Sequence, residues 1–175
     1  MKPVIEFMQQ VSFRMWASLG VLMSILSMLV VVFYFEYALG LEPCPLCVLQ
    51  RMCTIGMGVV ALVAVIHNPS SSLAKRIYFA VAAIPVICGI SIAGRHVWLQ
   101  NLPKDRVPEC GPGYDFIMDT FPFLDALEII FRGSGECADT QWQFLGLTIP
   151  GWALVFFVGL LLVLIYLAVR VPRTR

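Results

Sequence analysis

The sequence has 175 residues, of which 59% are hydrophobic and only 13% are charged. Soluble domains carry about 25% charged residues, so this composition excludes an ordinary water-soluble domain and indicates an integral membrane protein. The net charge of +1 argues against a nucleic-acid partner, because nucleic-acid-binding domains are strongly basic. The length predicts a single domain over residues 1–175.

Four apolar segments follow one another along the chain. A helix needs about 20 residues to cross the hydrocarbon of a bilayer, and we expect such helices at residues 15–35, 46–66, 77–96 and 151–169. The first segment is longer than the apolar core of a signal peptide, about 7–15 residues, which favours a retained helix over a cleaved signal. The predicted fold class is therefore all-α, a bundle of four transmembrane helices.

Two loops, at residues 36–45 and 97–150, separate the first helix from the second and the third from the fourth. The longer loop contains a short amphipathic helix at about residues 122–131, with Asp125, Glu128 and Arg132 on one side. That pattern suits a helix lying on the membrane surface. The alternative is a helix packed on its own small loop domain.

Basic residues are concentrated at both termini and around the turn between the second and third segments. They are Lys2, Arg14, Lys75, Arg76, Arg170, Arg173 and Arg175. The positive-inside rule therefore predicts that both termini face the cytoplasm and that loops 36–45 and 97–150 face the outer side.

Six cysteines occur, and Cys44, Cys47, Cys110 and Cys137 lie outside the apolar runs. Cysteines in such positions are expected on the oxidising side of a membrane, which agrees independently with the predicted orientation. Cys53 and Cys88 lie inside apolar runs, and we expect them to be small buried hydrophobic residues.

The pair Cys44-Pro45-Leu46-Cys47 lies at the mouth of the second apolar segment. Pro45 suits the first helical position, which makes Cys44 the N-cap. Arg51 is at i+7 from Cys44, so a helix carries both sulfurs and the guanidinium on one face. A helix N-terminus and an arginine both favour the reactive thiolate, and we therefore expect a redox pair.

Arg51 and His96 are candidate ligand-binding residues at the outer ends of the second and third segments. An ionisable group inside a membrane segment is a functional candidate by default, and Arg51 could bind the polar edge of a cofactor near the sulfurs. The alternatives are an arginine that extends to the interface and a surface histidine.

Two other interpretations of the cysteines stay open. A zinc site could use Cys44, Cys47, Cys110 and Cys137, although the last two lack the short spacing typical of zinc knuckles. Inert structural disulfides are the second, because a Cys110–Cys137 bond would stabilise a loop with little core. Glycines flank both loop cysteines and favour a mobile, exchanging disulfide.

The complete set of motifs resembles DsbB, the bacterial disulfide bond formation protein B family, over nearly the whole chain. The resemblance rests on Cys44-Pro45-Leu46-Cys47, Arg51, His96, Cys110 and the run Cys137-Ala138-Asp139-Thr140-Gln141-Trp142-Gln143-Phe144-Leu145-Gly146-Leu147. It implies an oxidoreductase of the bacterial inner membrane. Such an enzyme reoxidises a periplasmic, DsbA-like thioredoxin-fold protein and passes the electrons to a membrane quinone, either ubiquinone or menaquinone.

The same resemblance implies a role for each residue. Cys110 would receive the attack of the partner's thiolate, and Cys137 would release the oxidised partner and communicate with Cys44. Cys47 would face the quinone, with Arg51 and His96 beside the ring, and no metal is expected. The remaining enzyme alternative is a quinone reductase similar to vitamin K epoxide reductase, in which the active pair typically follows the loop pair instead of preceding it.

Overall fold

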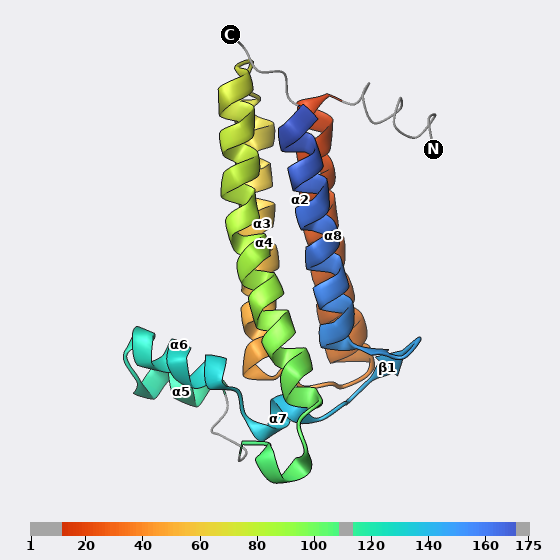
Figure 1. Ribbon diagram of the computed structural model, residues 1–175, viewed down its shortest axis with the longest axis vertical. Helices are drawn as coiled ribbons and strands as arrows, with labels where there is room; N and C mark the ends of the chain where they lie inside the picture. The colour runs from red at the N-terminus through yellow and green to blue at the C-terminus, as the bar shows by residue number, and fades with distance from the viewer. Residues whose placement is uncertain (1–11, 109–113, 171–175) are drawn as a thin grey trace.

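The computed structural model describes residues 12–108 and 114–170, which form a bundle of four long helices (Figure 1). Each of the four is long and apolar enough to cross a membrane, so the predicted four-helix membrane bundle is confirmed. The helices extend past the predicted apolar segments because their polar flanks also adopt helical backbone. They span Phe13–Ala38, Pro45–His67, Ser72–Gln100 and Ile149–Arg170.

The first long helix changes its winding along its length. Helix α2, Phe13–Leu29, begins where the Ser12 hydroxyl accepts a hydrogen bond of 3.3 Å from the Met15 backbone N–H. It continues without a break into a nine-residue π-helix, η1, Val30–Ala38. The chain therefore stays helical through residue 38, and the predicted loop at 36–45 is shorter than expected.

Helix α3, Pro45–His67, begins as the sequence predicts. Cys44 is the N-cap with an extended backbone (φ −69°, ψ 161°), and Pro45 occupies the first turn. The helix ends at Asn68, whose left-handed backbone (φ 39°) turns the chain toward helix α4, Ser72–Gln100. Helix α4 contains Pro85 without being interrupted.

The bundle is held together by close helix contacts at small residues. Helix α2 packs on α3, α3 on α4, and α4 on α8, Ile149–Arg170. Between α4 and α8, a Cβ added at Gly89 would come within 2.6 Å of the Phe157 ring. Between α2 and α3, the Ser24 hydroxyl donates a 2.9 Å hydrogen bond to the Thr54 carbonyl.

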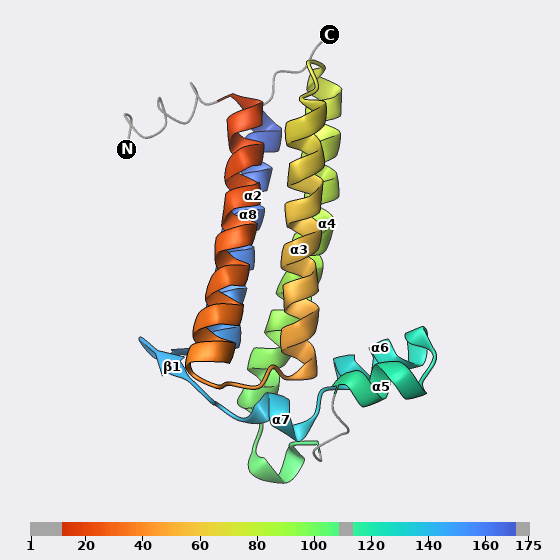
Figure 2. The same cartoon turned by 180° about the vertical axis from the view of Figure 1, so that it is seen from behind.

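The segment between α4 and α8 lies at the end of the bundle where α3 begins (Figures 1 and 2). It forms a two-stranded antiparallel hairpin next to α8, while α5 and α6 project to one side of the bundle. Its elements are η2 (Lys104–Arg106), α5 (Tyr114–Thr120), α6 (Phe123–Arg132), α7 (Gly135–Ala138), β1 (Gln143–Phe144) and β2 (Leu147–Thr148).

The predicted amphipathic helix is present as α6. Ala126 and Ile130 are buried, whereas Leu124 remains 75% exposed. On the polar side, Arg132 pairs with Glu128 at 2.7 Å. The location of α6 at a membrane surface stays a prediction.

The two cysteines inside the helices differ in their surroundings. Cys53 is half-buried and packs against two groups of buried residues, one around Leu46 and Ile92 and the other around Met57 and Val86. Cys88 is exposed on the outside of the bundle, so the prediction that it is buried was wrong. Hydrophobicity alone cannot distinguish an inward from an outward position in a membrane helix, because both faces are apolar.

Candidate functional site

Cys44 and Cys47 lie together at the N-terminus of α3. The Cys44 Sγ accepts a hydrogen bond of 3.4 Å from the Cys47 backbone N–H and lies 2.9 Å from the Cys47 Sγ. Cys44 is buried and Cys47 is partly accessible. Because Cys44 caps the helix with its own sulfur, that sulfur lies where the helix dipole favours negative charge.

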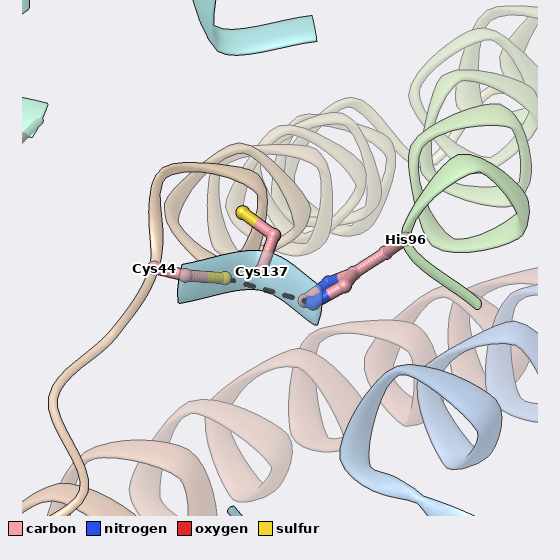
Figure 3. Close-up of side chains that lie close together, drawn as sticks. All are labelled: Cys44, His96 and Cys137. Carbon is pink, nitrogen blue, oxygen red and sulfur yellow. Dashed lines mark hydrogen bonds between the residues drawn. The ribbon is translucent and has the colours of Figure 1, made fainter. Parts of the chain in front are cut away.

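The loop cysteine Cys137 lies next to this pair. It is fully buried on α7, and its sulfur lies within 4.8 Å of both the Cys44 sulfur and a ring nitrogen of His96 (Figure 3). The fold therefore brings three predicted site residues from three elements into one cluster. The fourth predicted cysteine, Cys110, lies outside the described residues.

His96 is oriented by Gln50, a residue that the sequence analysis did not select. The Gln50 side-chain nitrogen is 3.2 Å from Nδ1 of His96, and Nε2 is 3.7 Å from the Cys44 sulfur (Figure 3). With the amide nitrogen as donor, Nδ1 accepts and Nε2 carries the hydrogen that faces the sulfur. Both side chains are buried, and His96 is only 2% exposed. The available sequence signal was a polar residue one turn after Cys47.

Arg51 on α3 forms a partly buried ion pair with Glu36 on η1. Its Nη1 is 2.8 Å from the Oε2 of Glu36, and only 18% of its side chain is exposed. Its Nε is buried and has no hydrogen-bond partner among the described residues. A buried donor without a partner is costly, so a ligand oxygen that reached this atom would relieve that cost.

An apolar cavity of about 580 Å³ opens beside Cys47 and Arg51. Its walls come from α2 with η1, α3, the segment before α8, and α8. Trp142 forms part of the wall, and its ring packs edge-to-face on Phe35 with the centroids 5.0 Å apart. His96 does not line this cavity but a small cleft shared with Cys44 and Cys47.

The pKa of Cys137 is raised above its ordinary value of 9.0. The principal cause is a hydrogen bond with the Cys44 side chain, to which burial of the thiol adds. At neutral pH, Cys137 in this arrangement is a protonated thiol that faces the Cys44 sulfur. A proton can thus be shared between the two sulfurs as one of them becomes a thiolate.

The cluster also has the ligand types of a soft-metal site. Cys44, His96 and Cys137 are all buried, and their ligand atoms lie within 4.8 Å of one another. Thiolates and imidazole are ligands that Zn²⁺ prefers. Among the described residues, His96 thus joins Cys44 and Cys137 of the four cysteines in the zinc alternative, while Cys110 lies outside the described residues.

Four apolar helices and a cluster of cysteines and a histidine at one end of the bundle define a multi-pass membrane protein with a cysteine-based site. Residues 13–167 match the family model described as "Disulfide bond formation protein DsbB". The chain belongs to this family.

Similar proteins named "Disulfide bond formation protein B" cover most of the chain. "Disulfide bond formation protein B" of Nitrosococcus oceani is 53% identical over 133 residues, covering 76% of this chain and 78% of the relative. The protein of the same name from Acinetobacter baumannii is 46% identical over 157 residues, covering 90% and 91%. The protein from Acinetobacter baylyi is 45% identical over 161 residues, covering 92% and 94%. The similarity therefore includes all four long helices and the segment between α4 and α8.

Proposed function

We propose that this protein is a protein-dithiol:quinone oxidoreductase of the bacterial inner membrane. It reoxidises a DsbA-like thioredoxin-fold protein in the periplasm and passes the electrons to ubiquinone or menaquinone. The observation that carries the proposal is the position of Cys44, whose sulfur lies beside the loop cysteine Cys137 and beside Cys47. Cys47 in turn borders the apolar cavity.

The electrons follow the sulfurs from the loop to the cavity. A thiolate of the donor attacks Cys110 of a Cys110–Cys137 disulfide, forming a mixed disulfide and releasing Cys137 as the thiolate. The donor's second thiol then displaces Cys110, so the donor leaves oxidised and the loop pair holds its two electrons and two protons. Each exchange forms one S–S bond and breaks one, as thiol–disulfide exchange requires.

The inner pair is the second relay. Cys137 attacks Cys44 of a Cys44–Cys47 disulfide and releases Cys47 as a thiolate at the cavity wall. Nε2–H of His96, aimed at the Cys44 sulfur, can stabilise the Cys44 thiolate that the next exchange releases. Attack of Cys110 on the Cys44–Cys137 bond then restores the loop disulfide and leaves Cys44 and Cys47 reduced.

The cavity beside Cys47 has the properties that a quinone requires. Its volume of about 580 Å³ lies within the range of about 300–1,000 Å³ typical of small-molecule sites. Its walls are mostly apolar and include Trp142, and the buried Nε of Arg51 is a donor without a partner in the part of the chain that the structure describes. Re-forming the Cys44–Cys47 disulfide would deliver its two electrons and two protons to a bound quinone, and Arg51 would donate to a carbonyl oxygen as negative charge develops there.

Quinone reduction by the purified protein tests the proposal. The protein in nanodiscs is supplied with a reduced thioredoxin-fold donor and a soluble ubiquinone or menaquinone analogue. Loss of quinone absorbance is then followed together with donor oxidation, and we expect one quinone reduced per donor disulfide formed. Absence of quinone reduction with every donor, including a small dithiol, would contradict the proposal and favour structural disulfides.

The soft-metal cluster supports a second candidate, a structural zinc site. Metal analysis of protein purified without chelator separates the two candidates. A zinc content near one per chain that survives dialysis, together with unfolding on chelation, would favour the structural site. The redox proposal predicts a chain without stoichiometric zinc and with thiols that titrate reversibly between oxidised and reduced states.

A further inference from the structure

The π-helix η1 and Arg51 both line the proposed quinone cavity. Glu36, on η1, contacts Arg51 on α3. We infer that Glu36 is a positioning residue, which fixes the Arg51 guanidinium at the cavity so that its remaining donors meet the quinone. The inference rests on the proposed function and adds to it a residue outside the cysteine and arginine motifs.

The first step of the argument is the backbone. A π-helix is rare and appears mostly as single turns at functional sites, whereas η1 extends over nine residues. The five-residue spacing of a π-helix is visible at its end, where the Leu39 N–H donates to the Tyr34 carbonyl at 3.0 Å. Wider turns rotate successive side chains differently from an α-helix, so the register of Phe35 and Glu36 depends on this winding.

The second step is the result of that register. Phe35 lines the cavity and packs on Trp142, while the next residue, Glu36, reaches Arg51. Two adjacent side chains thus contact two different parts of one cavity wall. A helix that continued as α would rotate these side chains relative to α3.

The third step is the charge. An arginine bordering an apolar cavity in a membrane helix is expensive without a partner, and Glu36 supplies one at 2.8 Å through a single oxygen. Only Nη1 is used in that contact, and the buried Nε stays without a partner among the described residues. Glu36 therefore restrains the guanidinium while leaving a donor for a ligand.

The experiment measures quinone binding and turnover separately. Trp142 lines the cavity, so quenching of tryptophan fluorescence by a quinone analogue in nanodiscs gives a dissociation constant without any electron transfer. Glu36→Leu removes the contact, and we expect the quinone dissociation constant and KM to rise about tenfold, the loss of about 1.4 kcal/mol of binding. The kcat with saturating quinone should stay within about twofold. Glu36→Gln keeps an accepting oxygen and should give an intermediate value.

A double-mutant cycle tests whether Glu36 acts through Arg51. In an Arg51→Ala background, Glu36→Leu should weaken quinone binding no further. The matched control is Glu128→Gln, which removes the carboxylate of the exposed Arg132 pair on α6 and should leave quinone binding unchanged. Thermal unfolding in nanodiscs confirms that each variant is folded.

The outcomes separate this inference from the proposed function. Unchanged quinone affinity in folded Glu36→Leu, or additive effects with Arg51→Ala, would overturn the positioning role while leaving the oxidoreductase intact. A parent protein that binds no quinone would overturn both. If the parent protein binds quinone and Glu36→Leu weakens that binding, but no dithiol donor is oxidised, the role of Glu36 is supported and the proposed oxidation of a dithiol donor is contradicted.

Discussion

Arg51 shows how one side chain can serve both a helix bundle and a cavity. Its ion pair with Glu36 joins η1 to α3, and its buried Nε remains without a partner among the described residues. A guanidinium suits this double contact because its donors point in several fixed directions, whereas the ammonium of lysine is a point charge.

Substitution of Arg51 tests its proposed contact with the quinone. Arg51→Ala should raise the quinone KM by about ten- to a hundredfold, because a hydrogen bond from a charged donor contributes about 1.5–3 kcal/mol. Arg51→Lys should recover only part of this loss, since the planar fork is absent. Steady-state kinetics with varied quinone measure both values. Full activity of Arg51→Lys would mean that the residue acts as a charge alone.

The two cysteine pairs should fail in different ways when they are substituted. Cys110→Ser should stop oxidation of the protein donor but leave Cys44 and Cys47 able to pass electrons from a small dithiol to quinone. Cys47→Ser should block quinone reduction from any donor, because the sulfur at the cavity is lost. Paired assays with both donors measure this difference. Parental activity in either variant would contradict the assigned order.

The raised pKa of Cys137 predicts a pH dependence in the reduced protein. The folded state holds this thiol proton more tightly than the unfolded chain, so the associated stability is present below the ordinary pKa of 9.0 and is lost as pH rises above it. The rate of alkylation of Cys137, measured by mass spectrometry, should therefore still increase with pH above 9.0.

The matched variant for this measurement is Cys44→Ser. It removes the sulfur responsible for the principal shift, and the alkylation profile of Cys137 should move toward lower pH. A midpoint below 9.0 in the otherwise native reduced protein would show that the two sulfurs do not interact in this way.

At the scale of elements, the start of α3 and the winding of η1 differ in how well the sequence predicts them. Proline fixes its own backbone and lacks an N–H, so Pro45 marks a first helical turn wherever it occurs in such a context. The π-helix has no comparable marker, since residues 30–35 read as the end of an ordinary apolar helix and residues 36–38 as the start of a loop. Its winding depends on contacts with α3 and Trp142 that are distant in sequence.

Packing between α4 and α8 depends on Gly89. An added Cβ would lie 2.6 Å from the Phe157 ring, and Phe157 is almost fully buried. Gly89→Ala should therefore destabilise the bundle by about 1–3 kcal/mol, the usual cost of overpacking. Thermal unfolding in detergent measures the change. Gly94→Ala on the same helix meets no atom within 4 Å and should be neutral or stabilising.

The site was only partly predictable for the same reason as the fold. Cys44, Cys47 and Arg51 share a helix face by simple spacing, so their proximity follows from local structure. The approach of Cys137 to Cys44 joins positions far apart in sequence, and spacing carries no information about it. Gln50 and Glu36 were missed because polar residues in apolar helices acquire meaning only from the partner that they face.

At the scale of the whole molecule, the ends of the bundle are chemically distinct. The cysteine cluster lies at one end, and the turn between α3 and α4 lies at the other (Figure 1). We predict that the cysteine end faces the periplasm. In a variant without reactive native cysteines, a membrane-impermeant thiol reagent applied to intact cells should label a cysteine introduced at Asn101 and not one at Ser71. The reverse labelling pattern would invert the proposed orientation.

The cavity lined by α2 and α8 determines which quinone concentration should control the reaction rate. In the packing order α2, α3, α4, α8, helices α2 and α8 are the first and the last, and both contribute apolar residues to the cavity wall. A ligand that enters between them comes from the bilayer. Its concentration there is the ratio of quinone molecules to lipid molecules. The rate should therefore follow the mole fraction of quinone in the membrane. Adding lipid at constant quinone should slow the reaction, whereas changing the volume of water should not.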